Sequence, residues 1–227
     1  MIQQQRYKTK QELVYTSLRG AIMRCDLPPG HRIIIDEVSQ ELGVSHIPVR
    51  EALQQLQSEG LIVNIPHTGA TVAPITVQSI SEVFVLMEGL ESVAMEVAAS
   101  QLTEETRAEL RHLVERMDGA VARGDIEEWS SLNADFHRAI AAATRMPLLR
   151  EMLGRVLDQW DRVRRFFNIV SRRIDIAQAE HHAILDALVA NDLDTLRDLA
   201  RRHARSAKDA YMSEVNARDS VVPEPAT

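Results

Sequence analysis

The chain has 227 residues, of which 45% are hydrophobic and 26% are charged, values typical of a globular protein with one large or two small domains. The single cysteine, Cys25, excludes an internal disulfide and favours a reducing compartment. No apolar run reaches the roughly 18 residues that a membrane-spanning helix needs, and the opening MIQQQRYKTK lacks the apolar core of a signal peptide. We therefore expect a cytoplasmic protein without a membrane segment.

The charge is distributed unevenly along the chain. Residues 1–75 hold as many basic as acidic side chains, so the whole net charge of −7 lies in residues 76–227. Within residues 1–35 there are six Lys and Arg side chains but only two Asp and Glu. A local basic face is enough to attract phosphate, even on an acidic protein. The first third of the chain is therefore a candidate for nucleic-acid binding.

Two short amphipathic helices are expected near the start. Residues 9–24 predict the first, because Thr9 and Glu12 make a capping box and apolar residues recur at helical spacing. Residues 36–42 predict the second, with Asp36 as its N-cap.

The stretch GVSHIPVREALQQLQSEGLI, residues 43–62, predicts a tight turn and a third helix. Gly43 supplies the turn and Ser45 is a suitable N-cap. Pro48 is tolerated in the first turn, where the N–H it lacks would have no intrahelical partner. The predicted buried stripe consists of Val49, Leu53 and Leu56.

Two strand-like runs, residues 61–65 and 70–73, flank the turn PHTG and predict a β-hairpin. Two helices joined by a short glycine turn, with a hairpin behind them, form the pattern of a winged helix-turn-helix. Such a motif places the start of its second helix in the major groove of DNA. The candidate contacts there are Ser45, His46, Ile47 and Arg50, and those at the tip of the wing are His67, Thr68 and Gly69. A small helical domain that docks on a protein is the alternative interpretation.

From about residue 79 the pattern changes to long helices. They are expected over residues 79–97, 104–123, 125–143, 147–170, 177–190 and 193–215. The fold class is thus mainly α, with an N-terminal winged helix-turn-helix and a C-terminal all-α bundle. The expected domains are a DNA-binding domain (1–75), a linker (76–78), an all-helical domain (79–215) and a flexible tail (216–227).

Four residues of the second half are candidate metal ligands. Asn133 and His137 are four residues apart and share a helix face, while His181 and His203 lie on two later helices. Three imidazoles and an amide oxygen gathered in a bundle core would bind a divalent transition metal such as zinc. The alternative is that each histidine is solvated or simply part of the core.

An enzyme is the competing class of function. Zinc held by three histidines with an open position can activate water. The sequence offers no general base at a convincing spacing, no phosphate-binding loop and no nucleophile motif. It therefore favours a protein that is not an enzyme.

The segments LPPG, GVSHIPVREALQQLQSEGLI and HTGATV resemble the winged helix of the GntR family of bacterial transcription regulators, over roughly residues 10–75. This resemblance implies a homodimer that binds a palindromic operator in double-stranded DNA. The family commonly has arginine where this chain has His46.

Residues 79–215 resemble the all-helical ligand domain, called FCD, of the FadR-type branch of that family. The pattern of its metal-binding members falls on Asn133, His137, His181 and His203, with Asn133 in place of an aspartate. The resemblance implies a bound divalent transition metal, zinc or nickel. It also implies a small-molecule effector, an organic acid or a related compound, bound at or beside the metal.

Met87 stands where this branch often has an arginine that holds the carboxylate of the effector. We expect Met87 and Phe84, together with Trp160 and Phe167, to line the effector pocket and Arg164 to supply a positive charge. The alternative for these apolar residues is a place in the core. Other candidates for that charge are Arg162, Arg165 and Arg172. The alternative function is a metal-responsive regulator, in which the ion is the signal or only structural.

Overall fold

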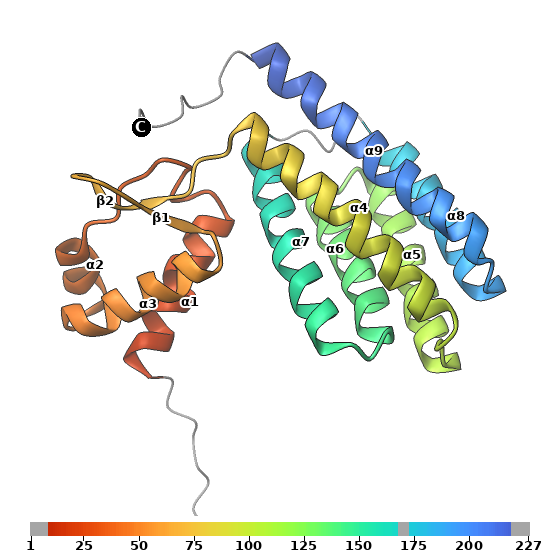
Figure 1. Cartoon of the computed structure of the whole chain (residues 1–227), viewed down its shortest axis with the longest axis horizontal. Helices are drawn as coiled ribbons and strands as arrows, with labels where there is room; N and C mark the ends of the chain where they lie inside the picture. Colours follow the sequence, from red (N-terminus) through yellow and green to blue (C-terminus); the bar gives the residue numbers. More distant parts are fainter. Residues whose placement is uncertain (1–8, 168–172, 219–227) are drawn as a thin grey trace, which may run out of the picture. The chain divides into compact units, whose positions relative to one another are not determined.

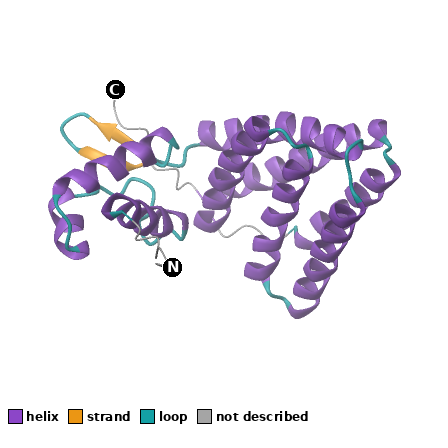
Figure 2. Ribbon diagram, turned by 90° about the horizontal axis from the view of Figure 1, so that it is seen from below, coloured by secondary structure: helices purple, strands orange, loops and turns teal. Residues whose placement is uncertain are grey.

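The computed structural model describes residues 9–167 and 173–218. They fall into two compact units, one ending at Ile75 and the other beginning at Thr76 (Figure 1). The two paired strands drawn in Figure 2 belong to the first unit, and the described part of the second unit is helical.

The first unit is a helix-turn-helix followed by a hairpin, which confirms the predicted class. Its elements are α1 (Lys10–Met23), α2 (Ile35–Leu42), α3 (His46–Ser58), β1 (Ile62–Ile65) and β2 (Gly69–Val72). The strands pair antiparallel, from Ile62 opposite Val72 to Ile65 opposite Gly69.

The turn between α2 and α3 is set by local backbone chemistry. The expectation that Asp36 caps α2 is wrong: Ile34 takes that position, because the Val38 N–H already donates to the Ile34 carbonyl at 3.1 Å. Gly43 ends α2 at a φ of 62°, a left-handed conformation that glycine adopts without strain. Ser45 occupies the N-cap position of α3, although its hydroxyl makes no capping hydrogen bond.

The core of the first unit forms where α1 and α3 pack against the hairpin. The predicted stripe of α3, Val49, Leu53 and Leu56, is buried there. Its neighbours in the core include Val14, Leu18, Ile22, Leu61, Ile62 and Val72. With one face of α3 held inward, the face that begins at Ser45 is left toward solvent.

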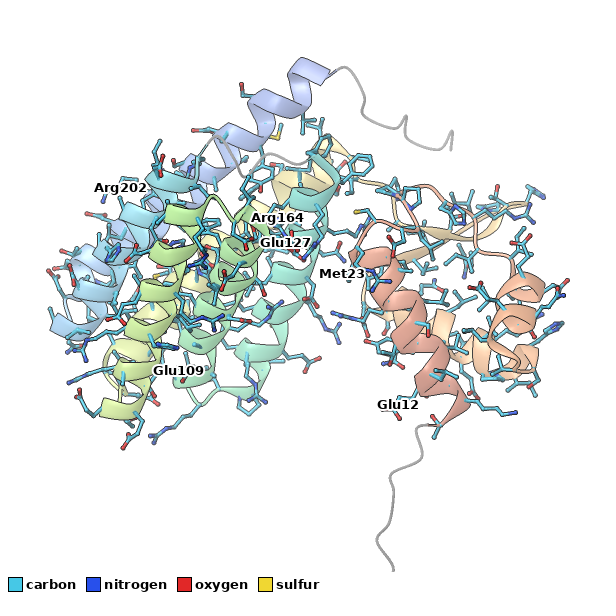
Figure 3. All side chains as sticks on the ribbon, turned by 180° about the vertical axis from the view of Figure 1, so that it is seen from behind. Glu12, Met23, Glu109, Glu127, Arg164 and Arg202 are labelled. Carbon is cyan, nitrogen blue, oxygen red and sulfur yellow. The ribbon has the colours of Figure 1, made fainter. Side chains whose placement is uncertain are left out.

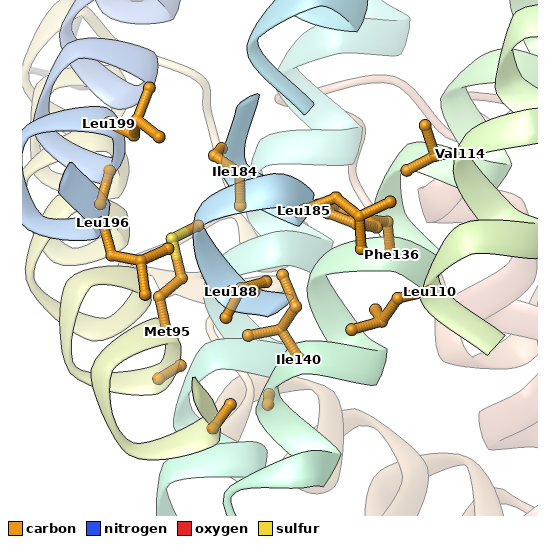
Figure 4. Close-up of a cluster of buried hydrophobic side chains, with 14 of the residues drawn as sticks. Met95, Leu110, Val114, Phe136, Ile140, Ile184, Leu185, Leu188, Leu196 and Leu199 are labelled. Atoms are coloured by element: carbon orange, nitrogen blue, oxygen red, sulfur yellow. The ribbon is translucent and has the colours of Figure 1, made fainter. Parts of the chain in front are cut away.

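The second unit is a bundle in which α4 and α9 run side by side (Figure 1). Its elements are α4 (Val77–Ala99), α5 (Glu104–Arg123), α6 (Ile126–Ala143), α7 (Pro147–Phe167), α8 (Ile174–Ala190) and α9 (Leu193–Arg218). Figure 4 shows part of its core, where α4, α5, α6, α8 and α9 contribute buried side chains such as Met95, Leu110, Phe136, Leu188 and Leu196. None of the described helices combines the length and the apolarity needed to cross a membrane.

Within the described part of the chain, α4, α8 and α9 differ from the expected bounds by two residues or more. α4 begins at Val77 because Thr76 and Ser79 cap each other, through N–H···Oγ bonds of 3.0 and 2.8 Å, so residues 76–78 belong to the start of a helix. α8 begins at Ile174, three residues early. α9 continues to Arg218, into the segment expected to be a tail. Residues 168–170 and 219–227 lie outside the described part of the chain.

Leu188→Ala should destabilise the second unit by about 2–5 kcal/mol, because Leu188 is fully buried and its loss leaves a cavity. Both tryptophans, Trp129 and Trp160, lie in this unit, so urea unfolding followed by tryptophan fluorescence reports on it. Leu148→Ala is the matched control, since Leu148 is 69% exposed and should cost less than about 0.5 kcal/mol. Equal effects of the two substitutions would contradict this view of the core.

Candidate functional site

Three imidazoles from three helices meet inside the bundle. His137 comes from α6, His181 from α8 and His203 from α9, and all three are buried. One ring nitrogen of each lies within 4.8 Å of the others. The ring centroids of His181 and His203 are 4.9 Å apart, and His137 is 5.5 Å from each of them. The structure thus brings together the histidines that the sequence singled out.

Two carboxylates face this cluster: that of Glu91 is buried, and that of Glu180 is 14% exposed. His137 Nδ1 lies 2.7 Å from Glu91 Oε1 on α4, without the alignment of a hydrogen bond. His203 Nδ1 lies 2.6 Å from Glu180 Oε2 on α8. Because each carboxylate faces Nδ1, the Nε2 atom of each ring is left for another partner. Carboxylates commonly orient metal-binding histidines in this way.

The carboxylates remain ionised despite their burial. Burial alone would raise the pKa of Glu91, but the nearby charge of His137, aided by His203, holds that pKa below its usual value. Burial acts likewise on Glu180, and His203 together with Arg173 outweighs it, so its pKa is also lowered. The cluster therefore sits between two negative charges, which favour a cation.

His181 is the ring without a partner. It is fully buried, and neither of its nitrogens is hydrogen-bonded to any described residue. Burial, together with the neighbouring His203 and His137, lowers its pKa well below the ordinary value. It is thus a neutral imidazole with lone-pair capacity to spare, the form in which histidine ligates a metal.

Asn133 lies one turn before His137 on α6 and is 3% exposed. No described residue is hydrogen-bonded to its amide, which lines a cavity beside the histidines. The cavity measures about 40 Å³, enough for water molecules or a small polar group. Its lining is mostly apolar and includes Met87, Trp129, Leu157, Trp160, Ile174, Ala204, Ala207 and Tyr211.

Residues with hydrogen-bond donors also line this cavity. Trp160 and Tyr211 are among them, and the Trp160 Nε1 and the Tyr211 hydroxyl are buried without a hydrogen-bond partner within the described ranges. Arg173 lines it as well, and its guanidinium is 2.6 Å from Glu180 and 3.0 Å from Ser206 Oγ. A ligand rich in acceptors would satisfy such groups, since a buried donor without a partner is costly.

Arg173 was not among the arginines considered from the sequence. The sequence could have indicated Arg173, because it precedes Glu180 by seven residues, which is about two helical turns. That spacing is compatible with the ion pair that the structure contains.

Of the residues expected to line the effector pocket, Met87 lines the cavity, whereas Phe84 and Arg164 do not belong to its lining. Phe84 is buried next to it and packs on Tyr211, with ring centroids 5.5 Å apart. Arg164 is not part of the lining: its guanidinium pairs with Asp161 at 2.6 Å and with Glu127 at 3.7 Å, because these acidic neighbours attract it (Figure 3). Arg172 lies outside the described residues.

The start of α3 presents the expected DNA-contacting side chains to solvent. Ser45, His46 and Arg50 are exposed, and Ile47 is 68% exposed although it is apolar. His46 Nε2 lies 3.1 Å from Asp36 Oδ1 on α2. At the wing, His67 and Gly69 are exposed and Thr68 is half-buried. The residues at the start of α3 and those at the tip of the wing therefore belong to the same compact unit.

One unit presents an exposed helix start with a wing, and the other holds a mostly apolar cavity beside buried histidines. This combination is typical of a regulator that binds DNA and a small ligand. Comparison with known proteins agrees. The family model of gntR bacterial regulatory proteins matches residues 10–72, and that of the FCD domain matches residues 82–206. The chain belongs to the gntR family, in its FadR-type branch.

Characterised relatives are similar over most of their length. The transcriptional regulator McbR of Escherichia coli K12 is 32% identical over 176 residues, which cover 75% of this chain and 78% of McbR. The transcriptional repressor RspR of the same strain is 26% identical over 198 residues, covering 87% and 86% of the two chains. The solved structure of E. coli McbR/YncC matches with a TM-score of 0.77 at 26% identity, covering 92% of this chain and 99% of that one.

His181→Ala should abolish metal loading, because it removes the ring whose two nitrogens have no protein partner. The neighbouring His182→Ala is the matched control: His182 is half-exposed and pairs with Asp118 at 2.9 Å. Elemental analysis after reloading with zinc should find about one ion per chain in the wild type and in His182→Ala. A His181→Ala protein that retained its metal would rule out this cluster as the metal centre.

Proposed function

We propose that the protein is a homodimeric transcription regulator whose affinity for a palindromic operator is controlled by a small effector bound at or beside a metal in the helical domain. The observation that carries the proposal is the buried histidine cluster next to a cavity lined by unpartnered donors. It is supported by membership of a family of regulators with an FCD ligand domain.

The DNA-reading surface in this proposal is the start of α3 with the tip of the wing. Arg50 pairs with a phosphate or with the edge of a guanine, and Ser45 reaches a phosphate. His46 and Ile47 read a base edge or a thymine methyl. His67, Thr68 and Gly69 lie along the backbone or in the minor groove. Because the whole chain carries a charge of −7, binding rests on this local surface and should weaken steeply with salt.

The metal ligands in this proposal are the imidazoles of His137, His181 and His203 and the amide oxygen of Asn133. The fit is supported by the unpartnered nitrogens of His181 and by the two carboxylates that face the other rings. Zinc or nickel suits such a donor set, and the bound ion would supply a Lewis-acidic position for an acceptor atom of the effector. Asn133 contributes no charge, and Glu91 and Glu180 provide negative charge from outside the ligand set.

The effector in this proposal is a small acceptor-rich molecule such as an organic acid. Trp160 and Tyr211 carry buried N–H and O–H donors without a partner, and Arg173 adds a guanidinium to the lining. These groups suit the acceptor atoms of such a molecule. Met87 supplies an apolar contact where related proteins often place a charged one. The cavity of about 40 Å³ favours a compact ligand.

The coupling in this proposal runs through α4. Met87 of this helix lines the cavity and Glu91 faces His137, while its cap, Thr76, follows the wing strand β2 within a few residues. An effector that favours one position of α4 would therefore bias the placement of the attached DNA-binding unit. By linkage, DNA weakens effector binding by the same factor by which the effector weakens DNA binding. The corresponding coupling free energy is typically 1–3 kcal/mol.

A second candidate is a regulator in which the ion itself is the signal, or in which it is only structural. The small volume of the cavity favours this alternative, because an ion with water fills it without any organic ligand.

Arg50→Ala should abolish binding to DNA fragments that the wild type selects from a random pool, with thermal unfolding unchanged, because Arg50 is exposed and makes no packing contact in the core. Arg24→Ala is the control: Arg24 pairs with Asp26 at 2.8 Å next to the end of α1. Unchanged affinity of Arg50→Ala would remove this residue from the contact surface.

Removal of the metal with a chelator should leave DNA binding intact but abolish the response to a panel of small carboxylic acids, because the acids need the ion for affinity. In the presence of metal, the active acid should weaken DNA binding about 5–150-fold. If zinc alone switches DNA binding, the ion is the signal. If chelation changes only the melting temperature, the ion is structural.

A further inference from the structure

The two carboxylates that face the histidine cluster differ in what else they hold. The carboxylate of Glu91 faces His137, and no arginine or lysine among the described residues pairs with it. Glu180 holds two partners through a single oxygen, because its Oε2 lies 2.6 Å from His203 Nδ1 and 2.6 Å from Arg173 Nη2. The negative charge of Glu180 is therefore divided between a ring of the cluster and a guanidinium, whereas that of Glu91 is not.

This division matters for the ring of His203. A carboxylate on one nitrogen of an imidazole makes the opposite nitrogen a stronger metal ligand. A guanidinium is a permanent cation, and its hydrogen bond to a carboxylate is charge-assisted and strong. At the same oxygen, it draws on the charge that would otherwise act on the ring. Arg173 therefore weakens the support that Glu180 gives to His203.

Arg173 is also placed where a ligand can reach it. Its side chain is 12% exposed and immediately precedes α8. It belongs to the lining of the cavity, whereas Glu180 does not. Its Nε donates to Ser206 Oγ at 3.0 Å, which fixes the guanidinium beside α9. An arginine has more N–H groups than these contacts use, so it can take a further carboxylate.

A carboxylate in the cavity would compete with Glu180 for this guanidinium. Whether it displaces Glu180 or shares Arg173 with it, less of the positive charge acts on Glu180. More of the Glu180 charge then acts on His203, and the ring becomes a better ligand. The sign of the effect is the same in both cases, and it requires no contact between the carboxylate and the ion.

We propose that Arg173 couples the cavity to the metal centre by dividing the Glu180 carboxylate with His203, so that a carboxylate bound at Arg173 raises metal affinity through Glu180. Arg173 is thus a positioning residue for the metal and the residue that recognises an anion in the cavity. The inference rests on the metal and the effector of the proposed function and adds how each depends on the other. By linkage, the metal raises the affinity for the carboxylate by the same factor.

Zinc affinity tests the division of Glu180. Arg173→Gln should bind zinc about tenfold more tightly than the wild type and Glu180→Gln about tenfold more weakly, as expected for outer partners of a metal-binding histidine. Arg173→Lys keeps the positive charge and should stay close to the wild type. The tightening is diagnostic, because damage to the fold would weaken zinc binding instead. Competition with a fluorescent chelator measures the affinities, and circular dichroism checks that the helices are intact.

A double-mutant cycle shows whether Arg173 acts through Glu180. In a Glu180→Gln background, Arg173→Gln should change zinc affinity by less than about threefold, because the shared charge is gone. Glu91→Gln is the matched background, since Glu91 faces the other ring and has no arginine partner among the described residues. There the roughly tenfold effect of Arg173→Gln should persist. An equal effect in both backgrounds would mean that the arginine repels the ion directly, and the inference would be wrong.

Acetate serves as the carboxylate probe for the coupling. Compared with chloride at the same ionic strength, excess acetate should tighten zinc binding by the wild type at least about fivefold. It should have no such effect on Arg173→Gln or Glu180→Gln. The chelator titrated alone in acetate corrects for acetate bound to free zinc.

The remaining outcomes separate this inference from the proposed function. If acetate tightens zinc binding equally in all three proteins, it binds the ion directly, so the coupling through Glu180 is wrong while the proposed function stands. If acetate leaves the zinc affinity of the wild type unchanged, the coupling is wrong as well. A wild type that binds no zinc would remove the metal from the proposed function, and this coupling with it.

Discussion

The burial of three imidazoles in one apolar bundle is the constraint on which the helical domain depends. A ring nitrogen without water must find a partner inside the protein, or the domain loses stability. Glu180 lies at hydrogen-bond distance from His203 and Glu91 faces His137, whereas His181 has no hydrogen-bond partner among the described residues. The carboxylates come from α4 and α8 and the rings from α6, α8 and α9, so one small polar centre fixes the positions of most of the bundle. Its remaining lone pairs and the net negative charge around it favour a cation.

α4 contacts the histidine cluster and the cavity, and its first residue follows the DNA-binding unit in the chain. Glu91 faces the histidines, Met87 lines the cavity, and Val85, Leu86 and Val93 are exposed on the outward face. The cap at Thr76 fixes where the helix begins, close behind the wing strand. In the proposed mechanism, a helix that is stiff over this length carries a shift at the cavity toward the DNA-binding unit.

The DNA-binding unit resolves an apparent contradiction in the composition. An acidic chain is a poor general binder of nucleic acid, yet α3 exposes Ser45, His46, Ile47 and Arg50 at its start while its other face is buried. The contact of His46 with Asp36 places a carboxylate beside the reading helix. A carboxylate at that position disfavours phosphate and leaves base recognition to the neighbouring side chains.

The sequence alone determined the order of the elements and the class of the fold, because helical periodicity, capping residues and glycine turns act over a few residues. Periodicity placed Asn133 and His137 on one face, the histidines of two later helices added His181 and His203 as candidates, and the family resemblance supported all four. Only the tertiary structure decided which side chains meet across helices. It brought Glu91 and Glu180 to the rings, placed Arg173, Trp160 and Tyr211 at the cavity, and turned Arg164 toward Asp161 and Glu127. The reason is physical: a local pattern fixes the direction of a side chain on its own helix, but its partner is set by how the helices pack.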